Sequence, residues 1–216
     1  MTIKTCSIFF LGWLLFLSFS CSEIRNKRAS NSLEVIYGRA LQENERKPIY
    51  SLSLPEGWQK IEEYPTDSLK DTTKPLGKWK KGEIILTVYN FPFSSLQERI
   101  PPHFQVDRWK KQLNAAPESI LIEPQAFSGY KGLYFEGIGF LEGKPSSMMA
   151  WALSLGDGHS FTLRKIKNRT QREDDLLNNL LSDITIKATG PRPSLEEYHD
   201  EIVAIARSFE TINPFP

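Results

Sequence analysis

Three histidines are the side chains in this 216-residue chain best suited to catalysis or metal binding: His103, His159 and His199. None of them has a second His or a Cys at the spacing of a metal-ligand set. Asp157-Gly158-His159 could join a further carboxylate in a metal site or a hydrolytic site, but Asp-Gly is a strong signal for a hairpin turn. His103 follows two prolines at the start of a helical pattern, and His199 lies beside Asp200 at the polar boundary of another. We therefore expect a turn at Asp157 and solvated positions for His103 and His199.

Two further patterns carry possible chemistry, and each has a simpler structural interpretation. Glu173-Asp174-Asp175 could be paired carboxylates for acid–base catalysis, but negative charge is also favoured in the first turn of a helix. Gly137-x-Gly139 lacks the third glycine and the following helix of a dinucleotide-binding loop. Glycine inside a strand pattern indicates close packing or a bulge. The sequence thus predicts no catalytic residue, no metal and no cofactor.

The amino-terminal segment has the composition of a secretory signal peptide. Residues 1–7 carry one positive charge, at Lys4, and residues 8–19 (IFFLGWLLFLSF) are almost wholly apolar. This run is shorter than the roughly 20 residues that a membrane-spanning helix needs. Ser18 and Ser20 are small residues at the spacing that signal cleavage requires. The sequence predicts a signal peptide over residues 1–20.

Cys21 follows the predicted cleavage point, and Ser18-Phe19-Ser20-Cys21 resembles the bacterial lipoprotein signal. In that signal the cysteine becomes the first mature residue and receives acyl chains, palmitate among them. Ser20 fits the pattern, whereas Ser18 stands where Leu is usual and Phe19 is bulky. The alternative is ordinary cleavage after Ser20, which would leave a secreted protein with an unmodified thiol.

Cysteine usage favours the acylated form of the mature protein. Cys6 leaves with the signal peptide, so Cys21 would be the single cysteine and could form no internal disulfide. Acylation removes a free thiol that would otherwise sit in an oxidising compartment. We expect acylated Cys21 to attach the protein to a membrane.

The charge balance argues against nucleic acid as the partner. Removing residues 1–20 takes only Lys4 from the 27 basic residues, which leaves 26 Lys and Arg against 26 Asp and Glu. A neutral mature chain without a strong basic run does not fit a nucleic-acid-binding protein. It also does not fit binding to a membrane by surface charge alone.

The sequence pattern divides the mature chain into three parts. Residues 21–47 are polar and predict a lipidated cysteine with a flexible tether, although residues 33–42 could form a short helix interrupted by Gly38. Residues 48–188 predict one α+β domain. Residues 189–216 predict a linker and a C-terminal amphipathic helix.

Alternating apolar residues predict most elements of the domain. Strands are expected at 49–54 and 58–64, as a hairpin over 76–91 around Lys80-Lys81-Gly82, at 119–127, and as a three-stranded meander over 130–167 that turns at Glu142-Gly143 and at Asp157-Gly158. Within the hairpin, Ile84, Leu86 and Val88 should face one side, and Ile85, Thr87 and Tyr89 the other. A helix is expected over 104–114, with Val106, Trp109 and Leu113 on its apolar face. These elements predict an antiparallel sheet packed with helices.

Two helices are expected after the strands. Thr170-x-x-Glu173 reads as a capping box, followed by an apolar series from Leu176 to Ile184. Ser194-x-x-Glu197 reads as a second capping box, and an apolar stripe then runs through residues 194–212. That stripe is too short for a coiled coil, so we expect it to pack on its own domain. An exposed apolar face there would favour binding of a protein partner.

Two short motifs resemble the Mog1/PsbP-like group of α/β/α sandwich domains. They are Leu54-Pro55-Glu56-Gly57-Trp58 at the start of the domain and the helix VDRWKKQL at residues 106–113. The resemblance covers residues 48–187 and implies a sandwich fold. It also implies a non-catalytic role, because the group includes a Ran-binding protein and a photosystem accessory protein.

Tryptophans offer the remaining candidate for a binding surface. Trp109 and Trp151 stand at apolar-periodic positions and are expected in the core. Trp58, beside Gly57, and Trp79, between two lysines, are expected to be freer to face solvent. A ligand or partner surface at Trp58 and Trp79 is the prediction.

Three functions remain open from the sequence. The leading one is a non-catalytic, membrane-anchored lipoprotein of the bacterial envelope that binds an unknown protein partner or supports an assembly, facing the periplasm or the cell surface. Ser22 after the cysteine, in place of Asp, favours the outer membrane over the inner. The second is a carrier or sensor of a small apolar ligand, which a large lined cavity would favour. The third is an envelope hydrolase, which convergence of Asp157, His159 and another carboxylate would favour.

Overall fold

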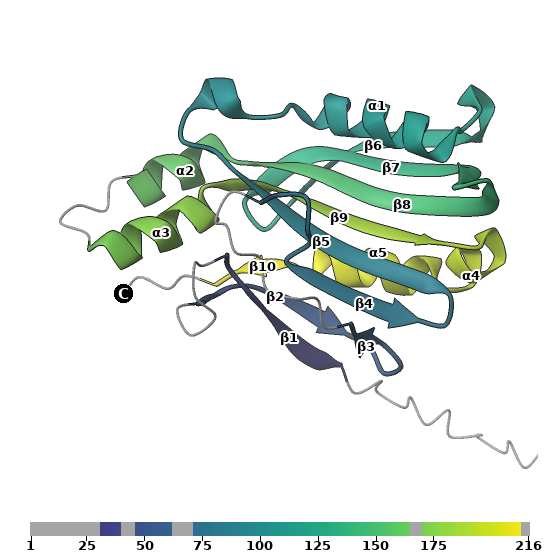
Figure 1. Ribbon diagram of the computed structural model, residues 1–216, viewed down its shortest axis with the longest axis horizontal. Coiled ribbons are helices and arrows are strands. Elements are labelled where there is room, and N and C mark those ends of the chain that lie inside the picture. Colours follow the sequence, from purple (N-terminus) through teal and green to yellow (C-terminus); the bar gives the residue numbers. More distant parts are fainter. Residues whose placement is uncertain (1–30, 40–45, 62–70, 165–169, 213–216) are drawn as a thin grey trace, which may run out of the picture.

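The computed structural model describes residues 31–39, 46–61, 71–164 and 170–212, which form two antiparallel sheets and several helices (Figure 1). The large sheet has seven strands in the order β3-β4-β5-β9-β8-β7-β6, and the small sheet has three in the order β1-β2-β10. Every recorded strand pair is antiparallel. The predicted α+β class with an antiparallel sheet is therefore confirmed. The large sheet consists of β3 (Gln59–Lys60), β4 (Gly77–Lys81), β5 (Ile84–Pro92), β6 (Ile120–Phe127), β7 (Tyr130–Leu141), β8 (Lys144–Leu155) and β9 (Ser182–Gly190), and the small sheet of β1 (Ser32–Tyr37), β2 (Pro48–Leu54) and β10 (Glu210–Thr211).

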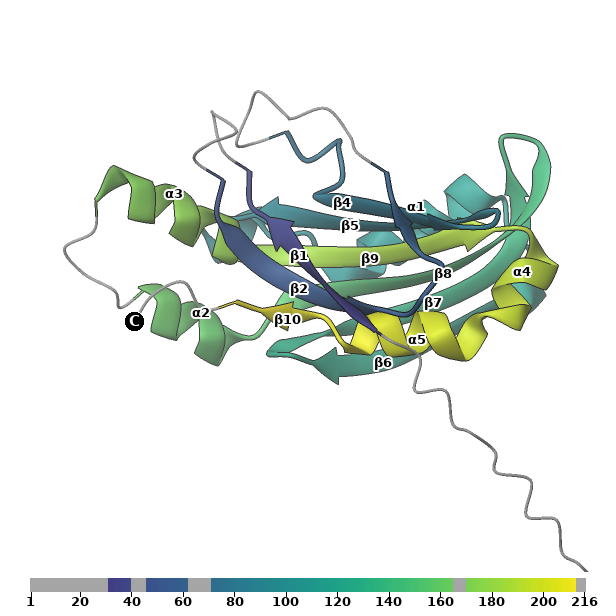
Figure 2. The same ribbon diagram turned by 90° about the horizontal axis from the view of Figure 1, so that it is seen from below.

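The helices and the small sheet lie on both faces of the large sheet. Helix α1 covers one face, while the small sheet and α5 cover the other (Figures 1 and 2). Between the sheets lies the larger apolar core, and a second core lies beneath α1. The helices are α1 (Pro102–Leu113), α2 (Asp157–Arg164), α3 (Gln171–Leu180), α4 (Arg192–Glu197) and α5 (His199–Arg207), with 3-10 turns η2 (Leu96–Glu98) and η3 (Pro117–Ser119).

The β4–β5 hairpin forms as its alternating sequence predicts. Ile84, Leu86 and Val88 are buried against the small sheet, while Ile85 and Tyr89 are only partly buried on the opposite face. Successive side chains of a strand point to opposite faces, so one hairpin contributes to both layers.

Helix α1 also forms where its periodicity predicts, and small residues on β7 give it room. Val106, Trp109 and Leu113 are its buried apolar residues. A Cβ added to Gly139 would lie 2.2 Å from the carbonyl oxygen of Leu113, and one on Gly137 would lie 2.7 Å from the Phe135 ring. The prediction that these glycines mark close packing within a strand is confirmed.

The predicted tether is wrong over part of its length. Ser32–Tyr37 forms β1 and pairs with β2, and Ile36 is buried in the core. Gly38 follows this strand rather than interrupting a helix, and a Cβ there would lie 3.1 Å from the Asn179 side chain. The domain therefore begins at Ser32 rather than at residue 48, while Cys21 and the predicted signal peptide lie outside the described residues.

The predicted boundary at residue 188 is also wrong. Helices α4 and α5 replace the single helix expected over 194–212, and β10 follows them. Helix α4 begins at Arg192 after Pro191 without a side-chain cap, so the second capping box does not form. Leu195, Ile202, Ile205 and Phe209 are buried in the main core. The stripe packs on its own domain, as expected, and is not an exposed face.

Three further elements differ from the prediction. Residues 182–190 form β9, a central strand, although Ile184 was assigned to the preceding helix. The capping box of Thr170 and Glu173 does form, but its helix α3 ends at Leu180. The expected third meander strand is instead helix α2, which begins at Asp157, where a carboxylate is favoured by the helix dipole.

Candidate interaction site at the amino end of α1

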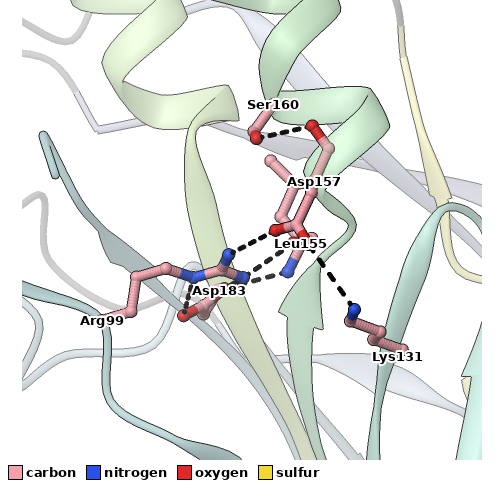
Figure 3. Close-up of polar contacts among 6 residues, drawn as sticks. All are labelled: Arg99, Lys131, Leu155, Asp157, Ser160 and Asp183. Atoms are coloured by element: carbon pink, nitrogen blue, oxygen red, sulfur yellow. Dashed lines mark hydrogen bonds and ion pairs between the residues drawn. The ribbon is translucent and has the colours of Figure 1, made fainter. Parts of the chain in front are cut away.

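A buried ion pair fixes the chain segment that leads into α1 (Figure 3). Arg99 Nη2 lies 2.6 Å from Asp183 Oδ1, and Arg99 Nε donates to Asp183 Oδ2 at 3.1 Å. The two side chains are only 12% and 7% exposed. Leu155 completes the arrangement, since its N–H donates to Asp183 at 2.9 Å and its carbonyl accepts from Arg99 at 2.7 Å. The segment before α1 is thereby joined to the end of β8 and the start of β9.

Two exposed charged side chains, those of Asp157 and Lys131, extend this ion pair toward the surface. Asp157, at the start of α2, lies 3.6 Å from Arg99 Nη1 and 3.7 Å from Lys131 Nζ. The guanidinium of Arg99 also lies over the Phe93 ring, at 4.5 Å from its centroid. Both charged neighbours of Asp157 are cations, so its recorded contacts are those of a structural ion pair. The side chain of His159 lies outside the described residues, so the convergence of Asp157 with His159 that would favour a hydrolase is not tested.

An open groove lies between the amino end of α1 and the edge of the large sheet. Its volume is about 600 Å³, and its walls come from α1, β6, β7 and β8. An adjacent enclosed pocket holds about 10 Å³, which is room for about one water molecule. Pro102 lines both spaces. The groove is lined by Pro102, His103, Pro124, Gln125, Ala126, Lys131, Gly132, Leu133 and Ser154.

Large apolar side chains are exposed in the segment that the Arg99 pair holds in place. Leu96 is 63% exposed, Ile100 43% and Phe104 59%. The His103 ring lies against Phe104, with 4.4 Å between the ring centroids. We call these three apolar residues together with the groove the α1 patch. It combines exposed apolar side chains with an open concave surface.

The edge strand β6 adds apolar surface next to the groove. Leu121 and Ile122 are both exposed, on opposite faces of the strand. Pro124 lacks an N–H, and proline in a sheet is confined to edge positions such as this one. The proline removes one donor from an edge that could otherwise pair along its whole length.

The prediction that Trp79 faces solvent as part of a binding surface is wrong. Its side chain is 0% exposed and lies in the main core, opposite Leu86 of β5. The flanking Lys78 and Lys80 point to the other face of the sheet, so the Lys-Trp-Lys sequence is the alternation of a strand with one apolar side. Gly77 makes room for the indole, because a Cβ there would lie 2.2 Å from the Trp79 ring.

Trp58 does not join Trp79 in a common surface. It is half-buried, and its indole N–H donates to Glu201 Oε1 at 2.6 Å. Lys81 Nζ binds the same carboxylate at 2.7 Å and lies over the Tyr198 ring. These contacts connect the turn after β2 with β4 and α5, which gives Trp58 a role in packing. Trp109 and Trp151 are buried, as predicted.

The other candidate residues are dispersed over the molecule. His103 is exposed at the start of α1, while His199 lies 3.0 Å from Asp200 and 3.6 Å from Glu136. Within the described ranges, no group of three His, Cys, Asp or Glu side chains is placed to hold a metal ion. None of the helices in those ranges is long and apolar enough to cross a membrane.

Sequence reasoning missed the Arg99–Asp183 pair entirely. The two residues are 84 positions apart, and Asp183 was assigned to a helix rather than to the first residues of β9. Pro101 and Pro102, which follow Arg99 and Ile100, were noted only as the residues before His103 at the start of a helical pattern. No local pattern marks a pair that forms when two distant segments meet at one end of a sheet.

Two solved structures resemble this one over most of both chains. One is the cyanobacterial PsbP, CyanoP, of Synechocystis sp. PCC 6803, with a TM-score of 0.47, 12% identity and coverage of 89% of this chain and 98% of that one. The other is LpqN, described as involved in cell envelope biogenesis of Mycobacterium tuberculosis, with a TM-score of 0.47, 9% identity and coverage of 85% and 93%.

The first neighbour is a PsbP protein, and the two sequence motifs resemble the Mog1/PsbP-like group. No family model and no curated protein sequence matches the chain. Similarity at this level concerns the arrangement of strands and helices and transfers no functional residue.

Proposed function

We propose that this protein is a non-catalytic lipoprotein of the bacterial envelope, whose domain binds a protein partner through the α1 patch. The observation that carries the proposal is the exposure of Leu96, Ile100 and Phe104 in the segment around the start of α1, where Pro102 and His103 line an open groove. Exposed apolar residues gathered around a concave surface mark interaction sites on soluble domains. The partner's identity is not part of the proposal.

The attachment point is compatible with a patch that faces away from the membrane. Ten residues separate Cys21 from Ser32, the first residue of β1. Fully extended, they span at most about 35 Å. Strand β1 lies on the opposite side of the large sheet from α1 (Figures 1 and 2). A chain anchored at Cys21 could therefore hold the domain close to the bilayer and present α1 outward.

A protein partner fits this site better than a small apolar ligand does. Small-molecule sites usually enclose most of their ligand in a cleft or cavity. Here the enclosed pocket next to α1 has room for about one water, and the larger space is an open groove. The groove offers a surface for side chains of another protein.

Mass spectrometry of the mature amino terminus tests the anchoring. We expect wild-type protein purified from its native cell to begin at Cys21 and to carry acyl chains, so that it partitions with membranes. The Cys21→Ala chain should be unacylated and soluble. A bare thiol on the wild-type protein, or cleavage elsewhere, would remove the lipoprotein part of the proposal.

Position-specific crosslinking tests the partner surface. A photoreactive amino acid replaces Phe104 in the α1 patch or, as the control, Lys144, which is exposed at the turn between β7 and β8. We expect a discrete crosslinked protein from position 104 in native envelopes, lost when Ile100→Ser is added, and none from position 144. Identical products from both positions would contradict the proposal.

A further inference from the structure

The large sheet ends in a strand whose outer side is open. Strand β6 is the last in the order of that sheet, and β7 is its one neighbour among the strands of the described residues (Figures 1 and 2). Its eight residues pair with β7 in one continuous register. Sheet edges of soluble proteins usually carry lysines, bulges or very short strands, which prevent pairing with another chain. Residues 120–127 instead contain one charge, at Glu123, and one proline, at Pro124.

The turn between β6 and β7 determines which main-chain groups face the open edge. Ser128 and Gly129 both have positive φ, as in a two-residue type I′ turn, whose flanking residues, here Phe127 and Tyr130, hydrogen-bond to one another. Main-chain groups alternate between the two sides of a strand, so those of the odd-numbered residues of β6 face β7. The residues whose main-chain groups face outward are Ile120, Ile122, Pro124 and Ala126.

Apolar side chains are exposed on both faces of this edge. Residues 121–124 are all exposed. Ile122 lies on the face that carries α1, because its neighbour Phe135 belongs to the core beneath that helix, and Leu121 lies on the other face. A partner lying on one face would cover one of these two side chains. A strand added in the plane of the sheet would contact both.

We propose that β6 pairs with β6 of a second copy of this chain, antiparallel, about a two-fold axis that passes through the sheet at Ile122. A two-fold axis makes the same strand serve as both partners. The two copies of Ile122 then exchange both of their main-chain hydrogen bonds. The N–H of Ile120 donates to the carbonyl of Pro124 in the second copy, so the proline takes part as an acceptor.

The neighbouring registers fit this edge less well. An axis at Glu123 would place two like charges directly opposite one another, which is destabilising. An axis at Pro124 would leave the central pair without an N–H donor. An axis at Leu121 would overlap only residues 120–122 of each strand. The axis at Ile122 overlaps residues 120–124 and sets Glu123 beside Leu121 of the second copy.

The charges of α1 are complementary about the same axis. Trp109 packs on Phe135, with 6.0 Å between ring centroids, and Phe135 pairs with the residue on the proposed axis, so the middle of α1 is level with it. His103 lines the groove with β6, and Asp107 and Lys110 follow four and seven residues later on that side of the helix. They form an ion pair at 3.2 Å. The axis reverses the direction of α1, so Asp107 of one copy is level with Lys110 of the other.

Sedimentation equilibrium measures this association. The chain without residues 1–20 and with Cys21→Ala is studied over a range of concentrations. One strand from each copy makes a small interface, so we expect a dimer that dissociates on dilution through the micromolar range. Ile122→Lys places two lysines opposite one another and is expected to weaken dimerisation by about tenfold or more. Leu33→Lys, at an exposed apolar position on β1 of the small sheet, is the matched control and should associate like the parent.

A disulfide bond tests the register. The parent chain of this experiment has no cysteine, because Cys6 is removed and Cys21 is replaced. Opposite residues of a hydrogen-bonded pair have Cα atoms about 5.5 Å apart, which a disulfide can span. We expect Ile122→Cys to form a covalent dimer under mild oxidation. Ala126→Cys is the control, because it is exposed on the same strand but away from the axis, and it should remain uncrosslinked.

Folding and association are distinguished by the same set of variants. Thermal unfolding shows that each variant folds, and Ile122 is exposed, so its replacement reports on pairing. A monomer at every concentration, dimerisation unchanged in Ile122→Lys, or equal crosslinking from the two cysteine variants overturns the proposal. The proposal does not depend on partner binding by the α1 patch, because a monomeric chain would still give the crosslink expected from position 104.

Discussion

At the scale of single residues, the Arg99–Asp183 pair shows why a buried ion pair matters most when it is broken. Both side chains are largely removed from water, and each makes more than one contact with its partner or with Leu155. The free-energy cost of removing two charges from water offsets much of the stabilisation that their attraction provides. Removing one partner leaves the other charge buried without compensation, and that is the larger effect.

Replacement of Arg99 by Gln is therefore expected to lower the free energy of unfolding by about 3 kcal/mol. Urea denaturation measures the change. Arg192→Gln is the control, because Arg192 pairs with Glu196 at the surface, where both side chains are 59% exposed, and such a pair contributes about 0.5 kcal/mol or less. Equal losses in the two variants would show that burial of the Arg99 pair is unimportant.

Buried tyrosines should make the protein sensitive to alkaline pH. Burial raises the pKa of Tyr130 to about 12 from an ordinary value of 10.0, and burial also raises the pKa of Tyr50 and Tyr134. Because the folded-state pKa is the higher one, the stabilisation is complete below pH 10 and is lost as the pH rises toward 12. For Tyr130 the loss amounts to about 3 kcal/mol by pH 12.

Urea denaturation across this pH range checks the effect. We expect Tyr130→Phe to lose less stability between pH 10 and pH 12 than the wild type does. Tyr37→Phe serves as the control, since Tyr37 is exposed on β1, and it should follow the wild-type curve. If Tyr130→Phe lost as much stability between pH 10 and pH 12 as the wild type does, the alkaline effect could not be assigned to Tyr130.

At the scale of elements, two glycines of β7 position α1, because the absence of side chains there lets the helix approach the strand closely. Gly137 and Gly139 leave space for the carboxyl end of the helix, and the opposite end follows the segment that Arg99 holds. A displacement of α1 would therefore disturb the α1 patch.

Gly139→Ala is expected to destabilise the protein by roughly 1–3 kcal/mol, because its Cβ would overlap the Leu113 backbone and force the helix outward. Gly158→Ala is the matched control, since nothing lies within 4 Å of its Cβ and alanine favours the helix by about 0.5–1 kcal/mol. Thermal unfolding should move in opposite directions for the two variants. A neutral Gly139→Ala would indicate that α1 is not seated on β7 as described.

Elements with strong local signals could be predicted from the sequence, and elements set by distant contacts could not. The β4–β5 hairpin and α1 each carry their own periodicity. Strand β9 begins only one residue after α3 ends, so Ile184 continues the apolar spacing of that helix and hides the change of structure. The sequence Asp157-Gly158 suits both a hairpin turn and the start of a helix. In the structure a helix begins there, and Asp157 at its first position lies next to Arg99.

The α1 patch could be predicted only in part. Periodicity assigned Val106, Trp109 and Leu113 to the buried side of α1. It did not reveal that Leu96 and Ile100, in the loop before the helix, would remain exposed. Trp79 shows the reverse error, since neighbouring lysines suggested exposure although strand alternation buries the ring.

At the scale of the whole molecule, the two ends of the described chain complete the second layer. Strands β1 and β10 both pair with β2, so the small sheet joins residues near 32 to residues near 211. Helix α5 lies against the same layer and buries Ile202 and Ile205. The segment assigned to a separate C-terminal helix is an integral part of the domain.

A chain that ends at Gly190 is therefore expected to lose cooperative unfolding. It would keep all seven strands of the large sheet but expose the core residues that Leu195, Ile202, Ile205 and Phe209 cover. Near-ultraviolet circular dichroism during thermal unfolding measures this. The control is a chain that ends at Ile212, after β10, which should unfold like the wild type. A sharp transition in the shorter chain would mean that the large sheet is stable without its second layer.

The central place of β9 has a consequence for how the protein is made. Strands β5 and β8 are its two neighbours, yet β9 is synthesised after both. Until residue 190 has been synthesised and is free to fold, the two halves of the large sheet are separate ribbons with unpaired edges. Such intermediates fold slowly and aggregate readily. We expect newly synthesised chains to need a holding chaperone until β9 has paired with β5 and β8.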